Sequence, residues 1–463
     1  MLDATDIARL IATGALTAVQ ATQDVLDRIA AHDGDLHAFL TVDAPGALAA
    51  ATAADAAQRR GDALGPLHGV PISLKDEVWT KGLRSTAGSR LYEQFVPETD
   101  SEAVARLRRA GAIIVGKTQL PEFAAWPQSK NLVGPEAVNP HDHSRISGAS
   151  SGGSAASVAS GMVPLALGSD GGGSIRIPSA LCGTFGLFPT PGLVPARDSF
   201  SYSPFASLGP ITRSVRDAAL MLQAIAGHDP LEVGSLDTPV PDYLSTLDAG
   251  VEGLRIAFTA DFGWIDADPR ITALTAEVAS RLTAVGAVVE QPAIEIEDIW
   301  PVFGAVTLGA SVYDGVRTPY MVSPTHVDRL LNGLDQLTPP LQMAVTSAPP
   351  TPEQYADAMV TIGRVREQFR IWFQSYDVIC SPTMAMLAPI SPQDWSMPYP
   401  DGRMGTNYTA YANVCCLTAA SYPCGPVAGL PVGLQVIGRG GAEALVLRVC
   451  RALEKVAPYS GLV

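Results

Sequence analysis

Apolar positions along the chain switch repeatedly between helical spacing and short continuous runs. Apolar side chains recur at helical intervals through residues 18–31, directly after Thr17, whose hydroxyl can cap a helix. Alanine-rich residues 47–60 predict a second helix, and Gly61 ends it. Residues 65–78 are GPLHGVPISLKDEV, an apolar stretch bounded by glycine and proline, which predicts a strand. The chain therefore begins with helices and then changes to strand.

This alternation continues to the end of the chain. Further strands are predicted at residues 112–119, 163–170, 254–261, 287–293, 376–383 and 430–438. Further helices are predicted at residues 101–110, 150–162, 214–227, 268–286 and 443–456. Strands that alternate with helices indicate an α/β fold, with a central sheet covered by helices on both faces.

No break in composition separates two halves of the chain, so we expect one domain, residues 1–463. We divide it into an N-terminal helical part (1–62), a part that holds the candidate chemistry (63–215) and a remainder of sheet, helices and loops (216–463). Two proline-rich segments, 337–354 and 388–405, predict surface loops. The second either covers a pocket or is a plain connector.

Composition and charge narrow the function classes. The formal net charge of −15 opposes binding to nucleic acid or to an anionic membrane, because phosphate contacts need clustered lysine and arginine. The N-terminus has no basic region followed by an apolar one, and no apolar run is long enough to cross a membrane. We expect a cytoplasmic protein, a monomer or homodimer, without nucleic-acid or membrane partners.

The cysteines and histidines do not have the spacing of a metal-binding site. The six cysteines form no C-x-x-C pair, so we expect buried thiols rather than ligands or disulfides. His141 and His143 flank Asp142, but no second cluster follows at ligand spacing. We therefore expect neither a metal nor an organic cofactor.

Lys75 is unusual because it lies within the apolar strand stretch. An unpaired ammonium is costly to bury, and burial lowers the pKa of a lysine and can make it a neutral base. The alternatives are a salt bridge with Asp76 or Glu77, or a side chain that reaches solvent from the strand end.

Two turns rich in serine and glycine follow. Residues 147–157 are SGASSGGSAAS, and residues 169–174 are SDGGGS. Glycines let several backbone N–H groups point at one spot, as an oxyanion hole requires, although flexible loops have the same composition. Neither the G-x-S-x-G motif of many hydrolases nor a phosphate-binding loop is present around Ser174.

Taken together in their order, these stretches resemble the amidase signature family over essentially the entire chain. The resemblance rests on GPLHGVPISLKDEV, on residues 147–190 and on LPVGLQVIGR near the C-terminus. It implies a twisted mixed sheet and a Ser-Ser-Lys triad of Ser174, Ser150 and Lys75. Family members place the two serines 24 residues apart, as this chain does.

The resemblance also implies roles for neighbouring residues. It implies a cis peptide bond before Ser150 and support from Ser151, and an oxyanion hole made by the backbone N–H groups of Gly171, Gly172, Gly173 and Ser174. Asp170 and Arg176 lie beside the nucleophile; Arg176 either binds substrate or forms a salt bridge with an acid such as Asp170. Residues 122–131 correspond to a stretch that lines the acyl side of the pocket, which suggests Ala124, Ala125 and Trp126 as substrate contacts.

Several positions depart from the family pattern. Ala149 stands where a glycine is usual, Gly171 replaces threonine or isoleucine, and Glu77 replaces a common asparagine. Phe188 and Leu193 stand where lysine and arginine are frequent. None of these changes removes a triad group, but Gly171 is expected to make the glycine run more mobile unless neighbouring groups hold it.

The sequence therefore predicts an amidase that hydrolyses carboxylic amide C–N bonds through a Ser174 acyl-enzyme. The apolar side chains of residues 124–126 favour an apolar or aromatic acyl group. One alternative is a carbamate, hydrazide or aryl-ester hydrolase with the same triad, since pocket shape decides the leaving group. Another is the glutaminase subunit of a tRNA-dependent amidotransferase, and a third is a non-catalytic binding protein with a degenerate triad.

Overall fold

An 11-stranded mixed sheet organises the molecule, in the order β1-β3-β2-β6-β8-β7-β12-β13-β11-β9-β10. The computed structural model describes residues 1–200, 203–308, 332–348 and 350–459. The strands of this sheet are β1 (Phe39–Val42), β2 (Pro71–Lys75), β3 (Ile113–Thr118), β6 (Leu165–Asp170), β7 (Phe185–Phe188), β8 (Ser207–Thr212), β9 (Arg255–Phe258), β10 (Val288–Glu290), β11 (Val378–Pro382), β12 (Thr418–Val427) and β13 (Leu430–Gly438). A separate hairpin contains β4 (Val138–Asn139) and β5 (Asp142–Ile146).

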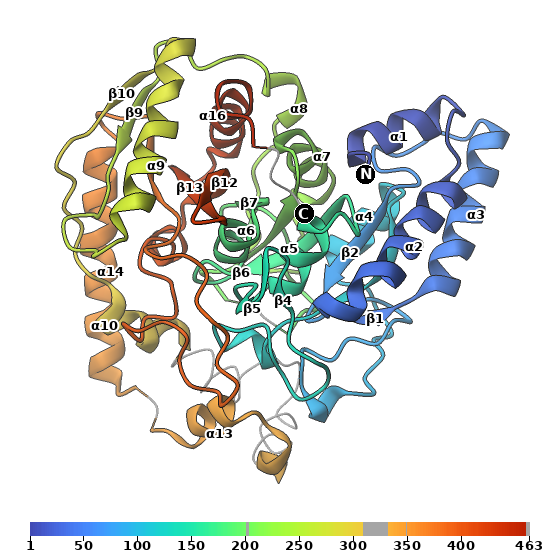
Figure 1. The fold of residues 1–463 in the computed structure, drawn as a ribbon, viewed down its shortest axis with the longest axis horizontal. Coiled ribbons are helices and arrows are strands. Elements are labelled where there is room, and N and C mark those ends of the chain that lie inside the picture. The colour runs from blue at the N-terminus through green and yellow to red at the C-terminus, as the bar shows by residue number, and fades with distance from the viewer. Residues whose placement is uncertain (201–202, 309–331, 349, 460–463) are drawn as a thin grey trace.

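Helices lie against both faces of the sheet and at its ends (Figure 1), as the alternation of elements predicted. The first half contributes α1 (Ala4–Ala12), α2 (Ala18–Leu36), α3 (Ala44–Arg60), α4 (Glu102–Arg109), α5 (Gly152–Ala159), α6 (Arg176–Cys182) and α7 (Val215–Ile225). The second half contributes α8 (Tyr243–Thr246), α9 (Pro269–Ser280), α10 (Trp300–Phe303), α13 (Pro339–Thr346), α14 (Pro352–Trp372), α15 (Ala410–Val414) and α16 (Glu443–Val456). None of the described helices is long and apolar enough to cross a membrane.

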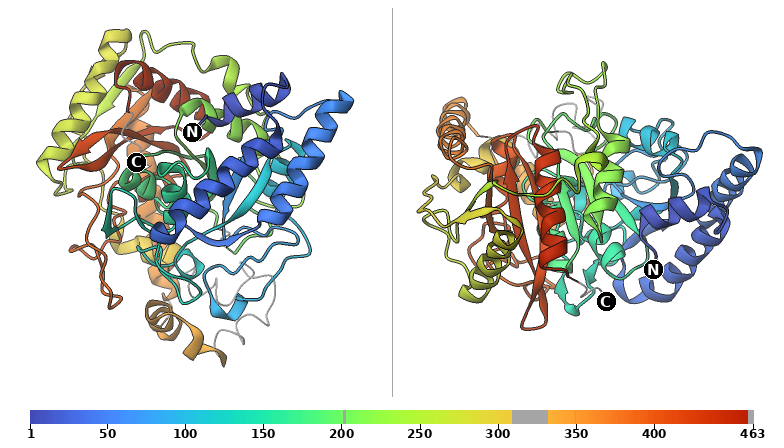
Figure 2. Two further views of the ribbon diagram at one scale, coloured as in Figure 1. Left: turned by 45° about the vertical axis from the view of Figure 1, so that its right-hand side comes forward. Right: turned by 90° about the horizontal axis from the view of Figure 1, so that it is seen from above.

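The N-terminal helices begin where side chains can cap them. The Thr17 hydroxyl accepts from the backbone N–H of Gln20, and the backbone N–H of Thr17 donates to the Gln20 side-chain oxygen. Helix α2 therefore starts with a complete capping box. Asp43 caps α3 and Pro45 occupies its first turn, so this helix starts three residues before the predicted Ala47. Helices α2 and α3 lie side by side beside the sheet edge formed by β1 and β3, opposite the end that holds α14 (Figures 1 and 2).

At β11 the two largest apolar cores lie on opposite faces of the sheet. On β11, Val378 and Cys380 enter the larger core, whereas Ile379 between them enters the second. Successive side chains of a strand point to opposite faces, which explains this division. The second core packs α14 and α15 against the sheet through residues such as Phe369 and Tyr411.

The arrangement of β2 and β6 brings the candidate chemistry together. The two strands are parallel neighbours, with Ser73 opposite Ala166. Their carboxyl ends therefore meet at one edge of the sheet, where α/β proteins usually place ligands. Lys75 ends β2 and Asp170 ends β6 at this edge.

The small residues of α5 allow close packing beside this edge. A Cβ on Gly153 would lie 2.5 Å from Gln119 N and from Ala38 O, which only glycine avoids. All eight residues of α5 are buried. The composition SSGGSAASVA is therefore that of a packed helix, as predicted, rather than of a flexible loop.

The prediction for residues 337–354 was wrong. Much of this segment is helical, because α13 lies within it and α14 begins at Pro352. Prolines favour the first turn of a helix, and here they mark helix starts rather than a loop. Residues 388–405 lack helices and strands, apart from an isolated bridge between Ile390 and Arg145.

Candidate active site

Lys75 is completely buried at the end of β2. Its Nζ lies 2.6 Å from Ser150 Oγ and 2.7 Å from Ser169 Oγ. Glu77 Oε1 lies 3.2 Å from the same nitrogen, and neither side chain of this ion pair is exposed. Burial lowers the pKa of Lys75, and the charges of Glu77 and Asp170 raise it without cancelling that effect. Lys75 thus has both features considered from the sequence, a salt bridge with Glu77 and a lowered pKa. The lowered pKa is the one that a general base needs.

Ser150 and Ser151 form the turn that leads into α5. The Ala149–Ser150 peptide bond is cis, as the resemblance implied. Ser151 N–H donates to the Ser174 carbonyl oxygen at 3.2 Å, and Ser151 Oγ donates to the Ser169 carbonyl oxygen at 3.1 Å. Ser151 therefore ties the two serine-bearing turns to each other.

Asp170 and Arg176 form a buried ion pair around the glycine run. Arg176 Nε and Nη2 each donate to a carboxylate oxygen of Asp170 at 2.9 Å, and neither side chain is exposed. The other guanidinium N–H groups donate to Thr409 O, Gln435 Oε1 and Asn413 Oδ1. Burial raises the pKa of Asp170, but Arg176 and the other donors outweigh it, so the pKa is lowered. Of the two roles expected for Arg176, the structure has the salt bridge with Asp170, and the three other acceptors take the remaining guanidinium N–H groups.

The glycine run is held by its neighbours. Gly173 N–H donates to Asp170 Oδ1 at 2.7 Å, and the φ of Gly173 is +129°. Thr409 Oγ1 donates to the Gly172 carbonyl oxygen at 2.6 Å. These bonds fix the two residues that follow Gly171, so the extra glycine does not leave the run without support.

The expected oxyanion hole comprised the backbone N–H groups of Gly171, Gly172, Gly173 and Ser174. In the structure Gly173 N–H donates to Asp170 instead. The backbone N–H groups of Gly171, Gly172 and Ser174 remain as candidates. Sequence alone could not reveal this, because it does not show which N–H groups a nearby carboxylate takes.

Ser174 is partly exposed at the end of the run. Its backbone is fixed to the serine turn through the bond from Ser151 N–H. Within the described residues, no hydrogen bond joins Ser174 Oγ to Ser150. Such catalytic bonds are often long before substrate binds and tighten in the complex.

Comparison with known proteins decides the family. A family model described as Amidase matches residues 20–447. The chain belongs to the amidase signature family. Its 11-stranded sheet is the α/β fold of that family, as predicted.

Relatives of this amidase chain differ in what they are described as doing. A glutamyl-tRNA(Gln) amidotransferase subunit of Moorella thermoacetica is 37% identical, over 99% of this chain and 97% of that protein. A solved bacterial aryl acylamidase of the amidase signature family has a TM-score of 0.88 at 27% identity, and 99% and 96% of the two chains are covered. The equivalent amidotransferase subunit of Thermotoga maritima has a TM-score of 0.80 at 29% identity, with the same coverage.

Residues 124–126 of the amidase chain were expected to contact substrate. Ala124 belongs to a short turn and has a φ of +59°, and Trp126 Nε1 donates to Gln128 Oε1 at 3.3 Å. The segment reaches the serine turn through Ser129, whose hydroxyl donates to the Gly148 carbonyl oxygen at 2.9 Å. A substrate role for Ala124, Ala125 and Trp126 stays a prediction.

Sequence reasoning missed two residues of the candidate site. Ser169 contacts the amine of Lys75, and its position at the carboxyl end of a strand parallel to β2 was an available signal. Thr409, which holds Gly172, lies 237 residues further along the chain. No local pattern around Thr409 indicates that contact.

A small pocket lies beside the glycine run. A Cβ on Gly172 would lie 2.8 Å from Phe303 Cζ and 3.7 Å from Thr406 Cγ2, and both residues line this pocket. Arg403 Nη1 donates to Asp298 Oδ2 at 2.8 Å within the lining. The other lining residues are Trp264, Ile299, Trp300, Asn407 and Ala410. Aromatic and paired charged side chains thus line this pocket, and two of its residues, Phe303 and Thr406, lie next to Gly172.

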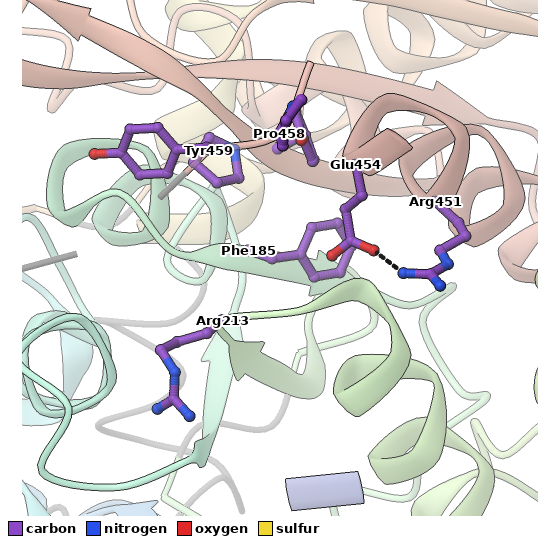
Figure 3. A pocket seen from close by; sticks show the side chains of 8 residues that line it. Phe185, Arg213, Arg451, Glu454, Pro458 and Tyr459 are labelled. Carbon is purple, nitrogen blue, oxygen red and sulfur yellow. Dashed lines mark hydrogen bonds and ion pairs between the residues drawn. The ribbon is translucent and has the colours of Figure 1, made fainter. Parts of the chain in front are cut away.

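A second hollow lies at the opposite end of α6 (Figure 3). A Cβ on Gly183, just after α6, would lie 2.8 Å from the hydroxyl oxygen of Tyr459 in its wall. Seven helical residues separate this end of α6 from Ser174, about 10 Å along the axis. The full lining is Phe185, Arg213, Tyr422, Pro423, Arg451, Glu454, Pro458 and Tyr459. Arg451 donates to Glu454 at 2.8 Å, so these two charges are paired. The hollow is separate from Ser174 because it lies at the other end of α6.

Proposed function

We propose that this chain hydrolyses carboxylic amides, with Ser174 as nucleophile, Ser150 as proton relay and Lys75 as base. The observation that supports the proposal most is the 2.6 Å contact between Lys75 Nζ and Ser150 Oγ in a fully buried setting. A serine hydroxyl is a weak nucleophile and needs a proton acceptor within reach. The lowered pKa of Lys75 favours the neutral amine that can accept the proton.

Each proton in the proposed reaction has a donor and an acceptor. As Ser174 Oγ bonds to the amide carbon, its proton passes to Ser150 Oγ while the Ser150 proton passes to neutral Lys75. The C–N bond then breaks, and Lys75 returns a proton through Ser150 to the leaving nitrogen. Water then attacks the acyl carbon and gives its proton through Ser150 to Lys75. Lys75 returns a proton to Ser174 Oγ as the carboxylic acid leaves. Ser150 can take part because a hydroxyl both donates and accepts.

Backbone N–H groups would stabilise the tetrahedral oxyanion. Gly171, Gly172 and Ser174 supply the candidate donors, and loss of one such donor costs about 100-fold or more in rate. The hydrogen bonds from Gly173 N–H to Asp170 and from Thr409 to the Gly172 carbonyl oxygen fix the run in advance. Donors fixed in this way need no reorganisation during the reaction.

Glutamine is the second candidate substrate, in a subunit of a tRNA-dependent amidotransferase. The 37% identity to a glutamyl-tRNA(Gln) amidotransferase subunit favours it over the free-standing amidase we expected first. The higher TM-score of the aryl acylamidase favours an arylamide instead. Both substrates need the same bond cleavage at Ser174. The glutamine candidate would bring protein and tRNA partners that the net charge alone did not suggest. The carbamate, hydrazide and aryl-ester alternatives gain no support from these relatives.

A substrate panel tests the proposal. Release of ammonia or amine would be measured for glutamine, a primary amide, an anilide and a carbamate, each with the wild type and with Ser174→Ala. We expect turnover of at least one amide, lost in Ser174→Ala. Glutamine hydrolysis that appears only with the other subunits of an amidotransferase would select the second candidate. Equal turnover by Ser174→Ala would overturn the proposal.

A further inference from the structure

Glu77 is a buried carboxylate in direct contact with Lys75. It follows β2 by two residues, and its Oε1 lies 3.2 Å from Lys75 Nζ with both side chains at 0% exposure. Glu77 stands where the family pattern commonly has asparagine. A neutral amide has thus been exchanged for a group that can hold a negative charge beside the proposed base.

Three contacts surround the amine of Lys75. Ser150 Oγ lies 2.6 Å and Ser169 Oγ 2.7 Å from Nζ, and Glu77 Oε1 lies 3.2 Å from it as the ion-pair partner. A neutral amine has two N–H groups and one lone pair, and the proposed transfer needs that lone pair to face Ser150 Oγ, from which the proton comes. An ionised carboxylate can only accept, so Glu77 can attract an N–H group but cannot compete for the lone pair as a donor would.

We propose that Glu77 is a positioning residue for the Lys75 base: it orients the neutral amine and stabilises the ammonium formed when the proton arrives. This inference rests on the function proposed above. The proton leaves Ser174 Oγ, passes through Ser150 and forms a third N–H bond on Lys75, which then pairs with the Glu77 carboxylate. When the proton returns to the leaving nitrogen, the amine and the carboxylate are restored.

Other charged groups near this pair are already engaged or lie on another strand. Asp170 also favours the ammonium of Lys75, but Arg176 holds both of its oxygens. Lys117 on β3 is buried, which lowers its pKa to about 8, while Asp76, Glu77 and Asp100 raise it. Glu77 thus lies near two buried lysines, Lys75 and Lys117.

The pH dependence of Ser174 labelling tests the inference. The rate of reaction with a fluorophosphonate would be measured across pH for the wild type, Glu77→Gln, Glu77→Asn and Glu77→Asp. Removing the charge weakens the base, so we expect labelling of the two amide variants at high pH to slow by about 10- to 100-fold. Their acid limb, the pH range in which labelling slows as Lys75 becomes protonated, should move down by about 1–3 pH units. The reason is that the Lys75 ammonium loses its carboxylate partner, so the pKa of Lys75 falls further. Glu77→Asp should return the limb toward the wild-type position.

Glu443→Gln serves as the matched control. Glu443 is 2% exposed and accepts from the backbone N–H of Thr190 at 2.8 Å; it begins α16, whereas Lys75 ends β2. Its variant should keep the wild-type acid limb. A slower Glu77→Gln with an unmoved limb would assign Glu77 a merely structural role and overturn the inference. Absence of Ser174 labelling in the wild type at every pH would instead overturn the proposed function, and this inference with it.

Discussion

Two buried ion pairs lie on either side of the Ser174 site, and they differ in what they can do with a proton. Asp170–Arg176 and Lys75–Glu77 both have 0% exposed side chains. Arginine side chains are not deprotonated in proteins. All five N–H groups of the Arg176 guanidinium donate hydrogen bonds. Lys75 has a lowered pKa and contacts two hydroxyls.

The comparison teaches that burial alone does not define a base. Arginine in a buried pair fixes structure, here the glycine run through Asp170. Lysine can lose its proton when buried, so the same degree of burial turns it into an acceptor. Neighbouring hydroxyls then decide whether that acceptor has a proton to take.

Removing Lys75 should have the largest effect on chemistry. In Lys75→Met the relay has no final acceptor, so we expect fluorophosphonate labelling of Ser174 to slow by about 10²- to 10⁴-fold. Circular dichroism would verify that the variant folds. A labelling rate equal to that of the wild type would remove Lys75 from the role of base and end the contrast between the two pairs.

Removing Arg176 should act on stability instead. Arg176→Met leaves Asp170 buried without its partner, which costs about 3–5 kcal/mol in the free energy of unfolding. Denaturant unfolding measures this value. Arg370→Met is the control, because the side chains of its pair with Glu367 are 60% and 52% exposed, and exposed ion pairs add little to stability. Equal losses in the two variants would show that Asp170–Arg176 is not an anchor.

The pH dependence of the wild type should report the titrating pair. Burial lowers the pKa of Lys75 below its ordinary value of 10.5, so the neutral amine predominates at pH values where a free lysine is charged. Labelling of Ser174 should rise about tenfold per pH unit and level off below pH 10.5. A rate that still rises at pH 10.5 would show that Lys75 titrates as an ordinary lysine.

Gly171 and Gly173 differ in how closely other atoms surround the place of a side chain. A Cβ on Gly173 would overlap Thr409 Oγ1 and require a φ of +129°, so Gly173→Ala should slow labelling by about 10- to 100-fold. A Cβ on Gly171 would meet only Ala206 Cβ at 3.6 Å, so Gly171→Ala should change the rate less than about threefold. Similar rates for the two variants would refute this account of how the run is held.

Much of this site follows from the sequence, and the rest depends on distant contacts. The apolar stretch that ends at Lys75 and the two serine-glycine turns are local patterns, and their meeting at one sheet edge follows from parallel strands. The contacts of Arg176 with Gln435 and Asn413 join residues more than 230 positions apart. Local sequence patterns do not predict hydrogen bonds between such distant residues. Helices α13 and α14 were missed because prolines that start helices were taken to mark a loop.

The central claim is that Ser174 is the nucleophile of a Ser-Ser-Lys relay. Its most direct test is to label the wild-type protein with a fluorophosphonate and to map the modified residue by mass spectrometry. The account predicts one label, on Ser174, that is absent from Ser174→Ala and much slower to form in Lys75→Met. A label on another residue, or an unchanged label in Ser174→Ala, would contradict it.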